Sequence, residues 1–235
     1  MARRPARRPA RPASAQKAAP PAGERGEIIA AFLALLSEQP FEEVRLADIA
    51  ARAGTSLAQL RGEFPSALAI LAAHMKAVDR AVLAGDFSDM EEEPVRERLF
   101  DVLMRRLEAL APHRQAIRSL LRSARRDPPL ALALNGLAVR SQQWMLAAAG
   151  IDASGPRGMI RAQGLAVLFA PVLRTWVRDE DPGLARSMAA LDRALARGQR
   201  LAGFLDDLCF IPSRLCRMRS RWRRRRDESE EPATA

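Results

Sequence analysis

The chain of 235 residues has no tyrosine, two cysteines and only two lysines, Lys17 and Lys76. Cys209 and Cys216 show neither CxxC spacing nor a neighbouring histidine, so they do not form the ligand pattern of a zinc site. No apolar run approaches the roughly 18 residues that span a bilayer, and no sustained alternation of β-branched residues indicates a sheet. These absences argue against a structural zinc site, a membrane-spanning helix and a β fold.

Catalytic patterns are also missing. His74 and His113 are far apart in the sequence, and neither a serine elbow nor a cysteine partner pattern accompanies them. No glycine-rich loop of the phosphate-binding type occurs, and the acidic run at residues 91–93 is typical of a solvated surface. We therefore predict no enzymatic activity, no cofactor and no metal, and we place His74 at the surface or at a domain contact.

Apolar residues, 48% of the chain, recur at helical spacing along most of its length, which predicts an all-α protein. The sequence divides into a disordered basic arm (1–23), a three-helix domain (24–84), a helical domain (95–209) and a basic tail (210–235). An acidic, turn-forming linker separates the two domains. Besides two short helices within residues 46–64, we predict helices over residues 24–37, 66–83, 95–110, 113–125, 130–149, 157–177 and 184–208.

The net charge of +10 is concentrated at the two ends of the chain. Residues 1–20 carry +6 and residues 214–235 carry +4, so the segment between them sums to zero. Basic tails attract phosphate on DNA or on an anionic membrane, and charge alone does not choose between them. Almost all the cations are arginines, which together with the many alanines is typical of a GC-rich bacterial gene.

Residues 46–64 carry the pattern of a helix-turn-helix, whose second helix can lie in the major groove of DNA. Gly54 stands where the chain must reverse, and Ser56 can cap the helix that follows. Ala50 is small enough for a close helix crossing. The apolar stripes of the two helices are Leu46, Ile49, Ala50 and Ala53 in the first, and Leu57, Leu60 and Phe64 in the second.

This region resembles the N-terminal domain of tetracycline-repressor-like (TetR) regulators over about residues 24–84. The motif residues that carry the resemblance are Phe41, Leu46, Asp48, Ile49, Ala50, Ala53, Gly54, Ser56, Leu60, Phe64 and Ser66, and Ile28, Ile29, Phe32, Leu33 and Leu36 match the helix before them. The resemblance implies a homodimer that binds a palindromic operator on double-stranded DNA. It also implies a C-terminal helical domain for dimerisation and for binding a hydrophobic small-molecule effector, which releases the DNA.

Contact residues for DNA follow from this resemblance and from their position. Arg45 precedes the first motif helix, where it can bind phosphate, and Lys76 with Arg80 can do so if the next helix approaches the backbone. Gln59 can pair with adenine and Arg61 with guanine. The other residues placed at the groove are Thr55 and Ser56. For each of these residues the alternative is a solvated surface position.

The second motif helix departs from the family pattern. Relatives usually carry Lys, Tyr, Tyr and His here, whereas this chain has Leu57, Arg61, Gly62 and Glu63. Residues 41–64 sum to about −1, and Glu63 would face phosphates unfavourably unless it pairs with a cation. The basic arm is expected to compensate for the missing positive groups.

Large, adaptable side chains on several predicted helices suggest an effector pocket. These residues are Phe100, Met104, Trp144, Met145, Met159, Phe169 and Trp176, and their alternative role is simple core packing. The last long helix carries a heptad seam of Met188, Leu191, Leu195, Gly198, Ala202 and Leu205. This seam predicts a dimer interface, although the helix over residues 159–177 could also cover it within one protomer.

A second hypothesis comes from residues 176–182 and 189–195, which resemble the end of the TetR-fold lipid-binding proteins of ubiquinone biosynthesis. Residues 204–226 interleave apolar side chains with arginines, a pattern suited to an anionic membrane surface. A lipid carrier without DNA binding has no reason to retain the helix-turn-helix motif, so we favour a cytoplasmic, nucleoid-associated transcriptional regulator, with weak membrane contact through the C-terminal tail as a further possible interaction.

Overall fold

The computed structural model describes residues 23–85 and 92–200, and every regular element within these ranges is helical. This confirms the predicted all-α class. None of the described helices combines the length and the apolarity required to cross a lipid bilayer. The predicted basic arm and C-terminal tail lie outside the described residues, except for Gly23.

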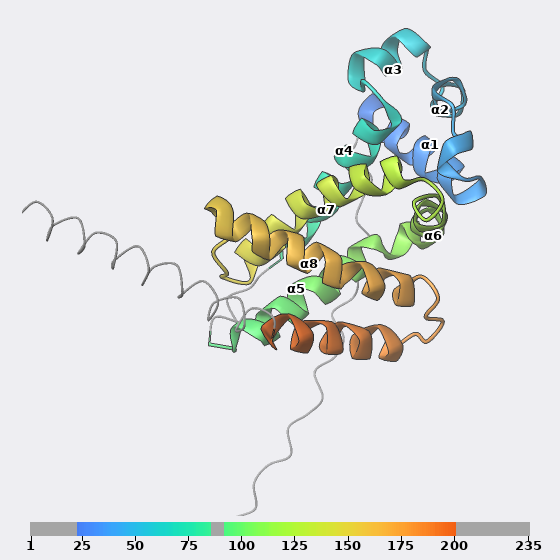
Figure 1. Ribbon diagram of the computed structural model, residues 1–235. Coiled ribbons are helices and arrows are strands. Elements are labelled where there is room, and N and C mark those ends of the chain that lie inside the picture. The colour runs from blue at the N-terminus through green and yellow to red at the C-terminus, as the bar shows by residue number, and fades with distance from the viewer. Residues whose placement is uncertain (1–22, 86–91, 201–235) are drawn as a thin grey trace, which may run out of the picture. The chain divides into compact units, whose positions relative to one another are not determined.

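The N-terminal helices occupy the blue-to-cyan part of the ribbon (Figure 1). They are α1 (Glu24–Glu38), the short 3-10 segment η1 (Phe41–Glu43), α2 (Leu46–Ala53), α3 (Leu57–Glu63) and α4 (Ala67–Leu83). α4 begins where the sequence supplies a cap, because the Ser66 hydroxyl accepts the Ala69 N–H at 3.2 Å.

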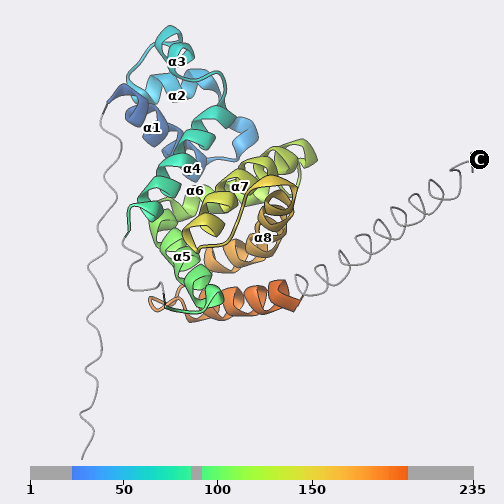
Figure 2. The ribbon, with the colours of Figure 1, turned by 90° about the vertical axis from the view of Figure 1, so that its left-hand side faces the viewer.

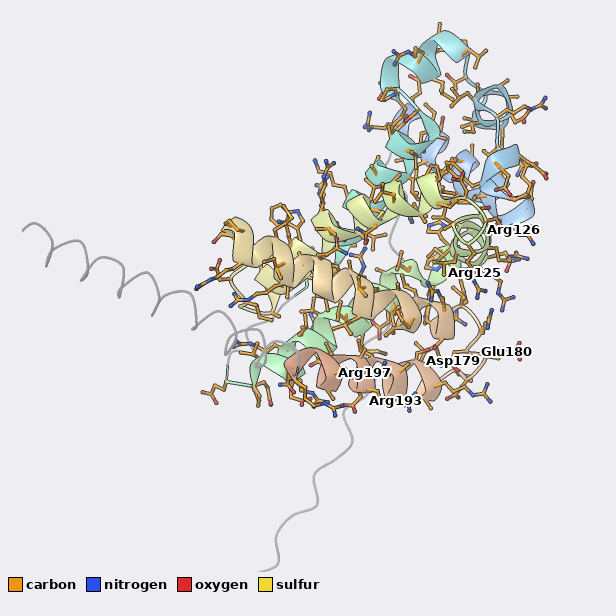
Figure 3. The ribbon with its side chains drawn as sticks, viewed as in Figure 1. Arg125, Arg126, Asp179, Glu180, Arg193 and Arg197 are labelled. Atoms are coloured by element: carbon orange, nitrogen blue, oxygen red, sulfur yellow. The ribbon has the colours of Figure 1, made fainter. Side chains whose placement is uncertain are left out.

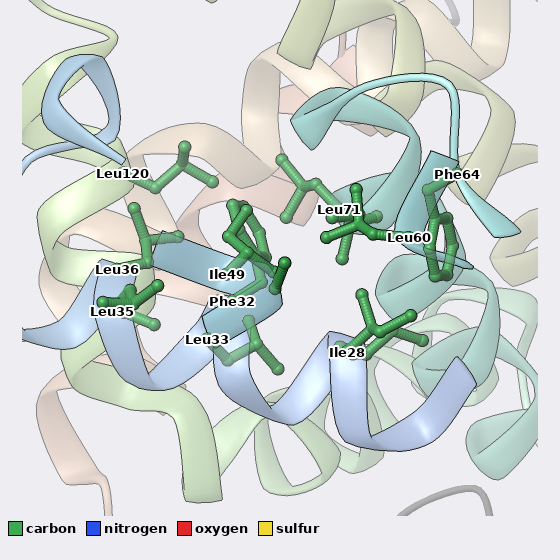
Figure 4. Close-up of a cluster of buried hydrophobic side chains, with 14 residues drawn as sticks. Ile28, Phe32, Leu33, Leu35, Leu36, Ile49, Leu60, Phe64, Leu71 and Leu120 are labelled. Atoms are coloured by element: carbon green, nitrogen blue, oxygen red, sulfur yellow. The ribbon is translucent and has the colours of Figure 1, made fainter. Parts of the chain in front are cut away.

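A hydrophobic core holds these helices together (Figure 4). Phe32 of α1 and Ile49 of α2 are fully buried, and Leu60 of α3 lies in the same cluster. The cluster also contains Ile28, Leu36, Phe64, Ile70, Leu71, Ala116 and Leu120 among others. Each large apolar side chain buried in this way contributes roughly 1.5–3 kcal/mol to folding. The two short motif helices are therefore held in place by packing against α1, α4 and α6 rather than by their own helical stability.

The next elements along the chain come after the acidic linker. They are α5 (Val95–Leu110), η3 (Ala111–His113), α6 (Arg114–Ser123), α7 (Pro128–Ala148) and α8 (Gly155–Trp176). The bounds of α5 agree with the prediction. α7 starts with proline in its first turn, where the missing N–H costs nothing, and the Asp127 carboxylate accepts the Leu130 N–H at 3.0 Å.

The chain divides within α8 into two compact units, Met1–Ala162 and Gln163–Ala235. In the first unit α1 packs against α2, α4 and α6, and α4 packs against α5 and α7 (Figure 2). Two hydrogen bonds strengthen the contact with α6: Ser119 Oγ donates to the Gln39 carbonyl, and the Phe41 N–H donates to Ser123 Oγ, both at 3.0 Å. The predicted domain linker therefore joins two helices, α4 and α5, that belong to one unit.

The second unit contains the remainder of α8 and a helix over residues 185–200. Buried Asp179, labelled in Figure 3, accepts the Ser187 N–H at 2.8 Å and the Ser187 hydroxyl at 2.6 Å. These hydrogen bonds lower the pKa of Asp179. Asp181 accepts the Ala185 N–H at 3.0 Å, so the two carboxylates satisfy amides in the first turn of this helix.

Candidate nucleic-acid interface

The turn between α2 and α3 has the geometry that the glycine predicts. Gly54 adopts a left-handed conformation, with φ 67° and ψ 25°. The Thr55 N–H donates to the Ala50 carbonyl at 3.0 Å, and the Gly54 N–H donates to the Ala51 carbonyl at 3.3 Å. This is a Schellman ending, which satisfies the last carbonyls of α2 and reverses the chain.

A capping box starts α3 immediately after this turn. The Gln59 N–H donates to Ser56 Oγ at 3.1 Å, and the Ser56 N–H donates to Gln59 Oε1 at 2.9 Å. The Thr55 hydroxyl lies 2.9 Å from Glu24 Oε1 and 3.2 Å from Gln59 Oε1 and can donate to one of them. Three of the predicted contact residues therefore also organise the helix start, and Gln59 Oε1 must exchange partners before it can pair with a base.

Most of α3 faces away from the protein core. Leu60 is its buried residue, while Gln59 and Arg61 are exposed, as DNA contact requires. Leu57 is 54% exposed, so the expectation that it belongs to the buried stripe is wrong. Side chains on a helix lean toward its N-terminus, and the side chain of this first helical residue extends past the helix start.

Arg25 of α1 binds the C-terminal end of α3. Its Nη1 donates to the Glu63 carbonyl and to Glu63 Oε2, both at 2.9 Å. The guanidinium carbon also lies 4.1 Å from the centre of the Phe64 ring, a cation–π contact. Glu63 thus has the cationic partner without which its charge would oppose a phosphate.

The arginines of α2 and its N-cap are also paired. Arg45 binds both oxygens of Asp48, at 2.9 and 3.0 Å, and Arg52 binds both oxygens of Glu38, at 2.6 and 2.9 Å. These hydrogen bonds lower the pKa of Asp48 and of Glu38. In contrast, Arg61 makes no ion pair with any residue in the described ranges, so its charge is available to a partner.

Solved structures place this arrangement in a known fold. A TetR transcriptional regulator from Nitrosomonas europaea ATCC 19718 superposes with a TM-score of 0.57 and 23% identity, over 74% of this chain and 97% of that one. A TetR transcriptional regulator from Rhodococcus sp. RHA1 gives 0.54 and 21%, over 74% and 95%. The chain has the TetR-type fold. Its sequence matches no protein-family model and no curated protein.

The TetR-type fold of this chain contains a cavity of about 520 Å³ between α4 and α7. Of the residues predicted to form an effector pocket, Trp144 lines this cavity. Phe100, Met104, Met145 and Met159 of the first unit do not line it, so a pocket formed by these residues stays a prediction.

The remaining predicted pocket residues occupy different surroundings. Met145 of α7 is fully buried, as expected for core packing, whereas Met159 of α8 is 52% exposed. Phe169 and Trp176 are buried residues of the second unit. Amphipathic spacing predicts which side chains are buried, but it does not predict where a cavity forms between two helices.

Lys76 lies on the second half of α4, and its contact with a DNA phosphate stays a prediction. It lines the cavity together with Arg80, both on the second half of α4, beyond the core residues Ile70 and Leu71. The sequence shows both cations on one helix, but it does not show that α7 lies beside them.

The predicted dimer seam of this chain is partly covered within the protomer. Leu191 and Leu195 are buried, and a Cβ at Gly198 would lie 2.9 Å from Leu168 Cδ1 of α8. These residues follow the intramolecular alternative, while Met188 is 38% exposed. Ala202 and Leu205 lie outside the described residues.

A buried polar cluster went unpredicted. Asp79 of α4 pairs with Arg106 of α5 and accepts the Ser141 hydroxyl of α7 at 2.5 Å, and all three side chains are buried. The available signal was an acid among the apolar positions of α4, between Val78 and Val82. No group of three or more His, Cys, Asp or Glu side chains in the described part of the chain could hold a metal ion.

The two histidines, distant in sequence, meet in the structure. Their rings cross edge to face with centres 4.8 Å apart, and His74 is buried. It therefore does not lie at the surface, and its contact with His113 follows the other predicted alternative, a contact between the predicted domains. Its Nε2 has no hydrogen-bond partner among the described residues. Burial, with smaller contributions from His113 and Arg106, lowers the pKa of His74 from 6.5 to about 4.

This shift makes stability depend on pH. Between pH 6.5 and 4 the unfolded chain binds a proton at His74 that the native state does not, so the free energy of unfolding falls as the pH falls. From pH 7 to pH 5 we expect a loss of about 2 kcal/mol from this residue, measured by urea unfolding. The His74→Gln variant should lose this part of the pH dependence, and an unchanged profile would contradict the assignment.

Proposed function

We propose that this protein is a DNA-binding transcriptional regulator that acts as a homodimer, with α3 as its recognition helix. The observation that carries the proposal is the exposed outer face of α3, which starts at a capped turn and presents Gln59 and Arg61. A helix presented in this way can enter the major groove. The TetR-type fold supports the same conclusion.

The outer face of α3 has suitable chemistry for a base sequence. Arg61 can donate two hydrogen bonds to guanine, and the exposed Leu57 can contact a thymine methyl group. The Ser56 hydroxyl accepts an amide within the cap and retains its own hydrogen to donate to a phosphate. Sequence selectivity is therefore assigned to a small set of residues in α3.

Dimerisation has support from α8. Ile160 and Val167 are 62% and 58% exposed, and Gly164 and Pro171, both exposed, continue the same face at helical spacing. An exposed apolar stripe of this kind is typical of an interface. The outer face of α8 is therefore our proposed dimer contact, together with the exposed part of the following helix. Two copies would present two recognition helices to a palindrome, in a protein that works in the cytoplasm on the nucleoid.

Selection of bound sequences from random DNA duplexes tests the proposal directly. We expect enrichment of inverted repeats whose half-sites are separated by about one helical turn, or a multiple of it. Enrichment of a single, non-repeated site would contradict the dimer, and failure to enrich any sequence at low salt would contradict DNA binding. Co-sedimentation with anionic liposomes in place of DNA would favour the lipid-carrier hypothesis.

Arg61 is the residue whose removal should weaken specific binding most clearly. The Arg61→Ala variant should bind the selected duplex about 10- to 100-fold more weakly and lose selectivity at one base pair, as measured by electrophoretic mobility shift. Arg52→Ala removes an equal charge whose guanidinium already binds Glu38, and we expect a change of about threefold or less. Equal losses in the two variants would argue against a base contact by Arg61.

A further inference from the structure

The cavity between α4 and α7 belongs to the first unit, and one part of its lining is apolar. Met75 and Leu83 of α4 contribute to it, as do Leu137 and Trp144 of α7. Its volume of about 520 Å³ falls within the range of sites that bind small organic molecules. Trp144 is 57% exposed, so the flat face of an indole is available to a ligand.

Three cations line the same cavity. Lys76 and Arg80 come from α4, Arg140 comes from α7, and all three side chains are exposed. The carboxylate in the lining is that of Asp79, which is already paired with buried Arg106 and hydrogen-bonded by Ser141. The buried Arg106 therefore neutralises the charge of Asp79. The cavity presents an excess of positive charge beside its apolar wall.

We propose that this cavity binds an amphipathic organic anion, in which a carboxylate contacts the three cations and an aromatic or aliphatic body packs on Trp144 and Met75. In the proposed regulator this anion would act as the effector, so the assignment rests on the proposed function. A neutral ligand would leave the three cations without partners, and a cationic ligand would be repelled by them. Charge-assisted hydrogen bonds from arginine and lysine to a carboxylate are among the stronger polar contacts in proteins.

The terminal segments of this chain are poor occupants of the cavity. Residues 1–22 carry six cations and no acid, and residues 201–235 carry eight arginines against six acids. Both segments are net positive, so the charges that line the cavity oppose them. Charge complementarity therefore favours a separate anion.

Isothermal titration calorimetry on the full chain tests this assignment, with naphthoate as the anion and naphthamide as its uncharged counterpart. We expect saturable binding of naphthoate and binding of naphthamide that is weaker by about tenfold or more. The double variant Lys76→Gln/Arg140→Gln should weaken naphthoate binding about tenfold or more, and Trp144→Ala should weaken both ligands. Arg125→Gln/Arg126→Gln is the matched control, because these two exposed arginines, which follow α6, do not line the cavity (Figure 3).

Equal affinity for the two ligands, or naphthoate binding that is unchanged in the double variant, would overturn the proposal, as would the absence of saturable binding at millimolar naphthoate. The same protein samples are assayed for DNA binding in parallel. Naphthoate binding without DNA binding would refute the regulator and leave the anion site standing. DNA binding without naphthoate binding would refute the anion site and leave the regulator standing.

Discussion

Replacing Asp79 by alanine should reduce the free energy of unfolding by about 3–5 kcal/mol, because the substitution leaves the Arg106 guanidinium buried without its counter-charge. Arg106 is only 4% exposed, so water cannot take the place of the carboxylate without opening the bundle. The Ser141 hydroxyl loses its acceptor as well. Such a loss is a large fraction of the 5–15 kcal/mol that typically stabilises a domain. Urea unfolding followed by circular dichroism measures it.

The paired variant Asp79→Leu/Arg106→Met separates a buried charge from a loss of packing. It replaces the ion pair with apolar side chains of comparable size, an exchange that is often neutral or stabilising. We expect it to recover most of the stability that Asp79→Ala loses. A single variant within 1 kcal/mol of the parent chain would mean that solvent reaches Arg106 in solution.

Deleting residues 1–22 should have the largest effect on DNA affinity. This segment carries five arginines and one lysine, whereas residues 41–64 sum to about −1 and Arg45 and Arg52 are already bound to carboxylates. Full engagement of six cations accounts for a slope of about −5 in the logarithm of affinity against the logarithm of salt concentration. We expect the deletion to remove most of this slope and to weaken binding at least about 100-fold at physiological salt.

A charge-preserving control accompanies this deletion. Exchanging the arginines of residues 1–22 for lysines keeps the six positive charges, so affinity and salt dependence should both remain close to those of the parent chain. A large loss in this control would indicate specific guanidinium contacts rather than general attraction to phosphate. An unchanged salt slope after the deletion would show that the phosphate contacts come from elsewhere in the protein.

Local features of this fold are predictable because they depend on neighbours in the sequence. The left-handed turn at Gly54 and the cap at Ser56 follow from the conformational freedom of glycine and from a hydroxyl three residues before an amide. The bounds of α5 follow from a proline before it and from its apolar spacing. Each of these signals lies within about one or two helical turns of the element that it specifies.

Contacts between distant residues escape this kind of prediction. Arg25 and Glu63 are 38 positions apart, and Asp79 and Arg106 are 27 apart, so no spacing rule connects either pair. Helical periodicity marks the apolar face of α4, but it does not say which helix covers that face. The cavity between α4 and α7 depends on that choice, and it became visible only in three dimensions.

The length of α4 lets this helix contribute to the core of the helix-turn-helix and also to the packing against α5 and α7. Its first half contributes Ile70 and Leu71 to the core beneath α2 and α3, while its second half buries Val78 and Val82 and meets α5 and α7. A polypeptide truncated after α4 would leave those valines, and the acid between them, facing solvent. Helices α1 to α4 are therefore not an autonomous folding module, and a fragment that stops near residue 84 would be a poor substitute for the intact chain in binding assays.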